Sequence, residues 1–305
     1  MSTENTGVVV IGDALIDEIR DARGVRELVG GAALNVAVGL RRLGVPVMLI
    51  AMVGADAAGD HIREYLSDHG VALIESPSAL GSSRAIVRAE NGEPQYEFNE
   101  AAQRRSIRYS DEARAAISQA ALVAVSCFPF DVRAEVAALS DAVGAARLVI
   151  DPNPRAGMLH DRAEFVRGFE ELAARAELIK VGADDAVLLY DGDLDALRAR
   201  LRGLGTRAVL ATAGADGAVL ESDAGEVTAP IAVLPGPIVD TVGAGDATLA
   251  AVAEGLMHEH PSSDAEWRRL LERAMAIAAA TVRSEGGLLR TPESLELSDI
   301  DRVDT

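Results

Sequence analysis

The chain has 305 residues, 49% of them hydrophobic, which supports one large core or a core with a small appendage and excludes disorder. Its formal charge is -19, from 29 basic and 48 acidic residues, and no run of basic residues occurs, so we expect no nucleic-acid partner. The single cysteine, Cys127, excludes an intrachain disulfide, and the absence of a signal-like or long apolar segment predicts a cytoplasmic protein with no membrane partner.

Short runs rich in Val and Ile alternate with helix-period segments along most of the chain. We expect buried strands at 7–13, 46–54, 121–128, 146–151, 176–181 and 207–212. The helices between them are expected at 31–44, 56–69, 131–143 and 161–175. This alternation predicts a doubly wound α/β fold, with a mostly parallel sheet flanked by helices, in a single domain over 1–305.

Two stretches break the rhythm with near-alternating apolar and polar residues. They cover 14–29 and 82–106, the second around the turn "ENGEP", and we interpret them as strands of a small separate sheet. Inserted at the carboxyl ends of the main strands, such a sheet would form a lid over the place where open α/β folds bind ligands. The alternative is an edge extension of the main sheet. An exposed lid could also pair with a second copy, which makes a homodimer conceivable.

The segment "DTVGAGDATLAA", residues 240–251, places glycines where a loop becomes a helix over 244–259. Gly243, Ala244 and Gly245 allow successive N–H groups to converge on an anion, and the helix dipole favours negative charge there. Asp246 follows on the first turn. It is either a structural acid that complements the dipole or the base that phosphoryl transfer to an alcohol needs. The dipole should keep the pKa of Asp246 low.

These residues resemble the C-terminal signature of the ribokinase-like carbohydrate kinases, the phosphofructokinase B family, whose pattern D-T-x-G-A-G-D is met in full. Three further segments resemble family elements in the same order: "GGAALNVAVGLRRLG" at 30–44, "VGADAAG" at 53–59 and "DPNPR" at 151–155. The resemblance covers nearly the whole chain and implies an ATP-dependent sugar kinase. In such a kinase, Asp246 is the base and the amides of 243–246 form the anion hole.

The resemblance also implies residues that bind the sugar acceptor. Asp13, Gly30, Gly31 and Asn35 would bind its hydroxyl groups, although Asn35 without the resemblance is better explained as a helix-interior amide satisfied within the core. The segment around Asn99 in the lid resembles fructokinase-like members, where this region faces the sugar, so a ketohexose such as fructose is the first choice. Ribose, 2-keto-3-deoxygluconate and nucleosides stay open as acceptors.

For ATP, the resemblance points to "TAGADG" at 212–217, with Thr212, Gly214 and Gly217 near the phosphates and ribose, and to helix 268–284 near the base. Asp240, with the carbonyl of Val242 and the loop 284–287, resembles a K⁺ site. Where the family has N-x-x-E beside Mg²⁺, this chain has Gly182 and Asp185. Asp185, or its neighbour Asp184, would then act through water, with Lys180 as a phosphate contact, or Asp185 is a surface carboxylate at a helix start.

Other activities find little support in the sequence. No G-x-G-x-x-G follows the first strand, no Walker A pattern occurs, and the five histidines show no metal-ligand spacing. A different class of function remains, because Gly182 and Asp185 depart from the family pattern. The chain could be a sugar-binding regulatory protein on the same fold with little turnover.

Overall fold

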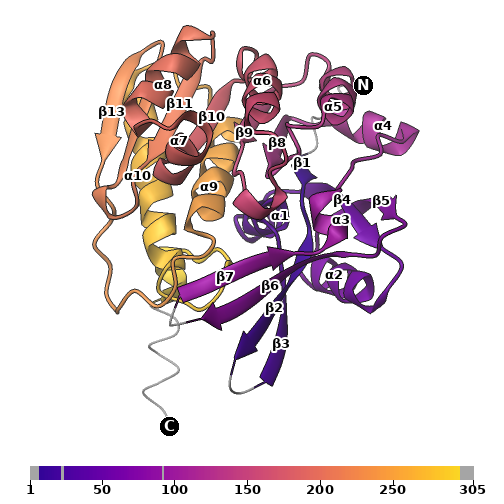
Figure 1. Ribbon diagram of the computed structural model, residues 1–305. Coiled ribbons are helices and arrows are strands. Elements are labelled where there is room, and N and C mark those ends of the chain that lie inside the picture. Colours follow the sequence, from indigo (N-terminus) through magenta and orange to yellow (C-terminus); the bar gives the residue numbers. More distant parts are fainter. Residues whose placement is uncertain (1–6, 22–23, 91–92, 296–305) are drawn as a thin grey trace.

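The computed structural model describes residues 7–21, 24–90 and 93–295 (Figure 1). Its main sheet has nine strands in the order β13-β12-β11-β10-β9-β8-β1-β4-β5. The seven strands from β11 to β5 are parallel to their neighbours, and β12 and β13 add an antiparallel edge. The expected doubly wound, mostly parallel sheet is therefore confirmed.

The expected strands and helices follow in the expected order along the chain, and the structure adds strands at 72–78, 218–222 and 225–229 that the sequence did not predict. The main strands are β1 (Val8–Gly12), β4 (Val47–Gly54), β5 (Ala72–Ser78), β8 (Leu122–Ser126), β9 (Leu148–Asp151), β10 (Leu178–Gly182), β11 (Ala208–Thr212), β12 (Ala218–Ser222) and β13 (Gly225–Ala229). The helices are α1 (Ala32–Arg42), α2 (Ala57–Asp68), α3 (Glu100–Gln103), α4 (Asp111–Gln119), α5 (Arg133–Val143), α6 (Arg162–Ala173), α7 (Ala183–Tyr190), α8 (Leu194–Gly203), α9 (Ala244–His258) and α10 (Asp264–Thr281). Short 3₁₀ turns occupy η1 (Ala156–Met158) and η2 (Gly214–Asp216).

Helix starts depend on side chains that accept hydrogen bonds from the first turn, as N-cap chemistry requires. Such caps begin α2, α3, α4, α6, α8 and α10, with Asp56, Asn99, Ser110, Asp161, Asp193 and Ser263. Helix α9 begins differently, at Gly243 in the left-handed conformation and without a side-chain cap. Its first amides are therefore left open, at the position where the sequence predicts an anion hole.

Two apolar cores cover the two faces of the main sheet. One contains buried residues of α1, α2, α9 and α10, and the other contains those of α4 to α8. Strand residues alternate between the cores, as Val8 and Val10 show on one face and Val9 and Ile11 on the other. Within the described part of the chain, no helix combines the length and apolarity that crossing a membrane requires.

A second sheet, which we call the lid, has four strands in the order β3-β2-β6-β7 (Figure 1). It contains β2 (Leu15–Asp21), β3 (Gly24–Gly30), β6 (Ser83–Glu90) and β7 (Glu93–Phe98). Two antiparallel hairpins are joined by the parallel pair β2–β6. The expected separate sheet is confirmed, but 99–106 is not strand: Asn99 caps α3, whose turn ends the alternation. The middle of "ENGEP", 91–92, lies outside the described residues.

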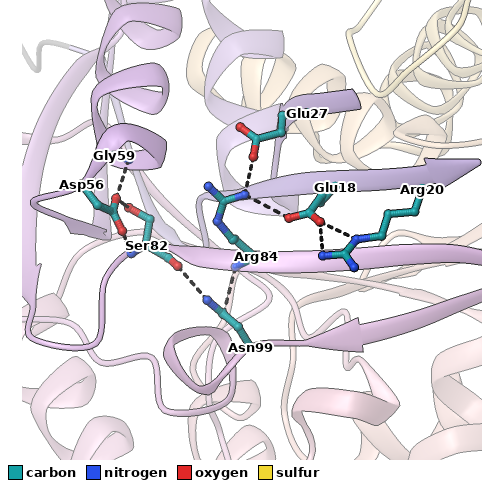
Figure 2. Close-up of polar contacts among 8 residues, drawn as sticks. All are labelled: Glu18, Arg20, Glu27, Asp56, Gly59, Ser82, Arg84 and Asn99. Carbon is teal, nitrogen blue, oxygen red and sulfur yellow. Dashed lines mark hydrogen bonds and ion pairs between the residues drawn. The ribbon is translucent and has the colours of Figure 1, made fainter. Parts of the chain in front are cut away.

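The lid is attached to the main sheet by a group of hydrogen bonds that we call the lid joint, formed by Asp56, Ser82 and Asn99 (Figure 2). Asp56 accepts from the Ser82 amide at 2.8 Å and from its hydroxyl at 2.6 Å, and also from the Gly59 amide at 2.8 Å. Asn99 donates to the Ser82 carbonyl at 2.9 Å and accepts from the Arg84 amide at 3.0 Å. The joint thus ties the end of β7 and the start of β6 to the first turn of α2.

Candidate active site

The turn that begins α9 presents free backbone donors. Gly243 has φ of 78°, and a Cβ there would lie 2.5 Å from the Cα of Gly287, so only glycine fits. Among the described residues, the N–H groups of Gly243, Gly245 and Asp246 have no acceptor, and that of Ala244 has only a long one, Thr241 O at 3.4 Å. The geometry can bind an anion at a helix N-terminus.

Asp246 lies beside these donors, and its side chain is held from the other side by α1. The residue is 6% exposed, and Asn35 donates to its Oδ2 at 2.9 Å. No described group donates to its Oδ1, so this oxygen can accept a further proton donor. Burial raises the pKa of Asp246 to about 6, against the hydrogen bond from Asn35 and the charge of Lys180. The expectation of a low pKa is wrong, because desolvation dominates at this position.

Two carboxylates lie close together where the chain passes from the main sheet into the lid. Asp13 follows β1, and Asp17 lies on β2. Asp13 is buried and accepts from the Ala33 amide at 2.9 Å, at the start of α1. Burial raises its pKa. Burial and then the neighbouring charge of Asp13 raise the pKa of Asp17 to about 6. We call Asp13 and Asp17 the lid-side carboxylates.

The two predicted glycines fit closely around these carboxylates. A Cβ at Gly30 would lie 2.4 Å from Asp17 Oδ2, and one at Gly31 would lie 2.9 Å from the carbonyl oxygen of Asp13. Gly31 also has φ of 111° where α1 begins. The predicted acceptor residues Asp13, Gly30 and Gly31 are therefore brought together, with Asp17 added to them.

Below the anion-binding turn lies a group of buried charges that we call the catalytic floor: Asp151, Lys180 and Asp185. Lys180 Nζ donates to Asp151 Oδ2 at 2.7 Å, while Asp151 Oδ1 has no hydrogen-bond partner among the described residues. A Cβ at Gly245 would lie 2.8 Å from Lys180 Nζ, so the ammonium group abuts the turn. Burial lowers the pKa of Lys180, but Asp151 and Asp185 outweigh it, and the net shift is upward.

Asp185 is the third member of the floor, and it is not a surface carboxylate. It is 8% exposed, and its Oδ2 accepts from the Gly182 amide at 2.7 Å. Burial and the charge of Asp151 raise its pKa to about 6, opposed by Lys180. The neighbouring Asp184 is exposed. The surface alternative for Asp185 is therefore wrong.

Arg155 supplies a second positive charge near the carboxylates. Its side chain reaches solvent. Burial by the surrounding protein lowers its pKa, but acidic groups around it, including Asp246, Asp13 and Asp151, outweigh this and raise it. Five carboxylates, those of Asp13, Asp17, Asp151, Asp185 and Asp246, thus lie near Arg155, an arrangement suited to polar or cation-bearing ligands.

The residues predicted for the nucleotide lie at the adjacent strand ends. Thr212 ends β11 beside Gly182 of β10 and donates to the Val181 carbonyl at 3.2 Å. Gly214 and Gly217 bound the short turn η2, both with positive φ, and a Cβ at Gly217 would lie 2.3 Å from Ala229 O. The turn follows the strand next to the catalytic floor. Its role in nucleotide binding remains a prediction.

Asp240 joins two loops near the start of α9. Its Oδ1 accepts from the Val242 amide and its Oδ2 from the Gly286 amide, each at 3.0 Å. This places Asp240 next to the predicted loop 284–287. Because both oxygens already stabilise the loops, the carboxylate has a structural reason to be there, and the K⁺ site remains a prediction.

Asn99 has a different setting from the other predicted acceptor residues. Both ends of its amide bind backbone groups in the lid joint and in the first turn of α3. It makes no hydrogen bond to Asp13, Asn35 or Asp246. The observed contacts make Asn99 a residue of the lid attachment.

Sequence reasoning missed Asp17, Asp151 and Arg155 as site residues. Asp17 stands in "GDALID", four residues after Asp13, and an acid within an otherwise apolar stretch was an available signal. Asp151 and Arg155 belong to the quoted "DPNPR", and Asp151 ends a buried strand, the usual place for a ligand-facing side chain in this fold class.

Comparison with known proteins shows the family to which the chain belongs. The model of the pfkB family of carbohydrate kinases matches residues 5–293. A fructokinase from Rhizobium leguminosarum bv. trifolii is 31% identical over 283 residues, covering 88% of this chain and 85% of the relative. The crystal structure of aminoimidazole riboside kinase from Salmonella enterica, complexed with aminoimidazole riboside and an ATP analogue, aligns with a TM-score of 0.76 at 25% identity, covering 95% and 98% of the two chains. An ATP-bound fructokinase from Xylella fastidiosa has the same fold, with a TM-score of 0.80 at 19% identity, covering 99% and 100% of the two chains.

The fold and the family match therefore define a phosphotransferase, and its structure places open amides beside a buried carboxylate. The chain belongs to the pfkB family of carbohydrate kinases. It is an ATP-dependent kinase that acts on a sugar or nucleoside.

Proposed function

We propose that the chain transfers the γ-phosphoryl group of ATP to a hydroxyl group of a ketohexose such as fructose. The observation that carries this proposal is Asp246, buried beside the free amides that begin α9 and held by Asn35. The fructokinase relative at 31% identity supports the choice of acceptor.

Asp246 acts as the base in this mechanism. Asn35 occupies Oδ2, which leaves Oδ1 to accept the hydrogen bond and then the proton of the attacking hydroxyl. The N–H groups of 243–246 stabilise the negative charge on the phosphoryl group during transfer. A carboxylate with a pKa of about 6 is ionised at neutral pH and remains a stronger base than an ordinary aspartate.

The lid-side carboxylates favour an unphosphorylated polyol. Hydroxyl groups donate hydrogen bonds to carboxylates, whereas a phosphate group on the acceptor would meet the charges of Asp13 and Asp17. This matters because relatives differ: an ATP-dependent 6-phosphofructokinase from Thermoanaerobacterium thermosaccharolyticum is 26% identical, covering 97% of this chain and 92% of the relative. We therefore place an unphosphorylated sugar ahead of a phosphorylated one, and the fructokinase relative leads us to place fructose ahead of ribose, 2-keto-3-deoxygluconate and a nucleoside.

The catalytic floor fits the Mg²⁺ that accompanies ATP. Hard oxygen ligands suit this ion, and Asp151 has a buried oxygen without a partner, next to Asp185. The described residues contain no group of three or more His, Cys, Asp or Glu side chains able to hold a metal. Asp151 and Asp185 would hold the ion together with nucleotide phosphates and water. When bound, Mg²⁺ neutralises charge on the phosphates.

A panel of acceptors tests the proposed function. ADP release is measured with fructose, fructose 6-phosphate, ribose, 2-keto-3-deoxygluconate and a nucleoside, each with and without K⁺. We expect the highest kcat/KM with fructose. Sugar binding by calorimetry without ADP release from any acceptor would instead support a sugar-binding regulatory protein.

A further inference from the structure

A groove with a volume of about 400 Å³ lies at the end of the main sheet away from the candidate active site, and we call it the far groove. Glu177 and Arg207 line it just before β10 and β11 begin, whereas β10 ends at Gly182, beside the catalytic floor. The turn between β12 and β13, the loop between α9 and α10, and Trp267 of α10 complete the lining. Small-molecule pockets have volumes of roughly 300–1,000 Å³, so the far groove has room for a small organic ligand.

The acidic side chains of the far groove already have arginine partners. Glu177 accepts two hydrogen bonds from Arg147, at 2.7 and 2.8 Å. Asp223 accepts one from Arg202 at 2.8 Å. This hydrogen bond and the charge of Arg202 lower the pKa of Asp223, and the charge of Arg207 adds to the effect. Each of the two carboxylates is therefore compensated by an arginine of its own.

Four other side chains of the far groove offer donors without acceptors. Within the part of the chain that the structure describes, the side chains of Arg207, His260 and Trp267 make no hydrogen bond. Ser222 accepts from the Ala224 amide at 3.2 Å, and its hydroxyl proton is donated to no described group. Oxygen atoms with negative charge are the acceptors that such a set of donors binds best.

Arg207 is the charged member of this set. The chain as a whole repels anions, because its formal charge is -19, so an anion site on it depends on local donors that no acid occupies. Arg207 is exposed, and although it attracts Asp223, its N–H groups are not taken up by that carboxylate. A guanidinium group binds a phosphate or a carboxylate through two parallel N–H bonds.

The far groove also offers a fixed apolar surface. Trp267 belongs to the apolar core on one face of the main sheet and is only 7% exposed, so its ring has little freedom to move. Pro261 lines the groove as well. An indole ring combines a large apolar area with one polar N–H. A ligand that carries a short carbon skeleton beside its charged group therefore fits this lining better than a bare ion.

We propose that the far groove is a second binding site, which takes a small organic oxyanion, either a phosphate ester or a carboxylate. Arg207 is its charged contact, His260 and Ser222 add hydrogen bonds, and Trp267 lies against the carbon skeleton. The site shares no residue with the acceptor or nucleotide sites, so this inference does not rest on the proposed function.

The chain contains one tryptophan, which gives a direct readout of the groove. With ¹⁵N-labelled indole, the single side-chain signal is that of Trp267, and it is followed during titration with fructose 6-phosphate, citrate and inorganic phosphate. Fructose and sodium chloride at matched concentrations are the uncharged and ionic-strength controls. We expect a saturable shift with fructose 6-phosphate, which indicates a phosphate ester, or with citrate, which indicates a carboxylate. No saturable shift with either, a shift with inorganic phosphate alone, or the same shift with fructose would overturn the proposal.

Three variants show where the ligand binds. Arg207→Met should weaken binding at least about tenfold, because hydrogen bonds to a charged group are lost. Arg133→Met is the matched control, since it removes the same charge from a side chain that is 82% exposed and does not line the groove. Asp13→Asn alters the candidate active site, and both it and Arg133→Met should keep the affinity within about twofold of wild type. An affinity that Arg207→Met leaves unchanged, or that Asp13→Asn abolishes, would overturn the proposal.

Discussion

The lid joint and the catalytic floor both hold aspartates, but in opposite ways. In the joint, three donors from Ser82 and Gly59 satisfy Asp56, and although burial alone would raise its pKa, these hydrogen bonds lower it (Figure 2). Burial dominates for Asp185 in the floor and for Asp246 beside the floor, and it raises the pKa of each to about 6. A carboxylate saturated with donors stabilises an attachment, whereas one that is buried and short of donors is ready to accept a proton.

The strongest way to test this comparison is Asp246→Asn. We expect turnover to fall at least about a hundredfold, because the base is lost while the amides of the turn remain. Steady-state kinetics and calorimetric sugar binding measure the effect. Asp264→Asn is the control, since Asp264 lies in the first turn of α10 but is exposed. Turnover within about threefold of wild type in Asp246→Asn would remove this residue from the mechanism.

The pH profile gives the next largest effect. Asp246 must be ionised to accept a proton, so protonation below its pKa of about 6 removes activity, and raising the pH through 6 restores it. We expect kcat/KM to fall at least about tenfold per pH unit below 6, because Asp17 and Asp185 have pKa values in the same range. The measurement covers pH 4.5 to 8.5 with fructose as acceptor. A flat profile down to pH 5 would show that burial does not control this carboxylate.

Asp56→Ala tests the joint. It removes one acceptor shared by α2 and the start of β6, so we expect the free energy of unfolding to fall by about 2 kcal/mol. The KM for the sugar should rise roughly tenfold, with a smaller change in kcat, because the lid is less well ordered before binding.

Asp193→Ala is the matched control for this prediction. Asp193 caps α8 by accepting from the Ala196 amide, and it makes no contact with the lid. This variant should lose about 1 kcal/mol of stability with no change in KM. Equal KM values in the two variants would mean that the joint does not order the lid.

The smallest effect is expected from the ion pairs on the lid itself. Arg84 contacts Glu18 at 3.3 Å and Glu27 at 2.6 Å, and Glu27 is 41% exposed (Figure 2). Arg84→Met should therefore cost only about 0.5–1 kcal/mol of unfolding free energy, less at high salt. Urea denaturation at two salt concentrations measures this. A loss above about 2 kcal/mol would mean that these ion pairs contribute as much to stability as buried charges do.

Patterns within the sequence predicted most of the fold. Strands buried on both faces are continuous runs of Val and Ile, and amphipathic helices follow each other at short spacing, so the α/β order and the position of the lid were predictable. The structure of segment 99–106 was not predictable in this way. The alternating pattern of the sequence continues past Asn99, but the side chain of Asn99 caps a helix. Local propensity alone does not decide between these outcomes.

The sequence by itself also determined the start of α9, since "GAGD" defines both the open amides and the neighbouring acid within one turn. Only the tertiary structure decided how those residues behave. Asn35 reaches Asp246 across 211 positions, and Lys180 reaches Asp151 from another strand. Burial raised the pKa of Asp246 where the helix dipole alone predicted a low value. The physical reason is that desolvation and contacts between distant segments depend on packing, which no local pattern specifies.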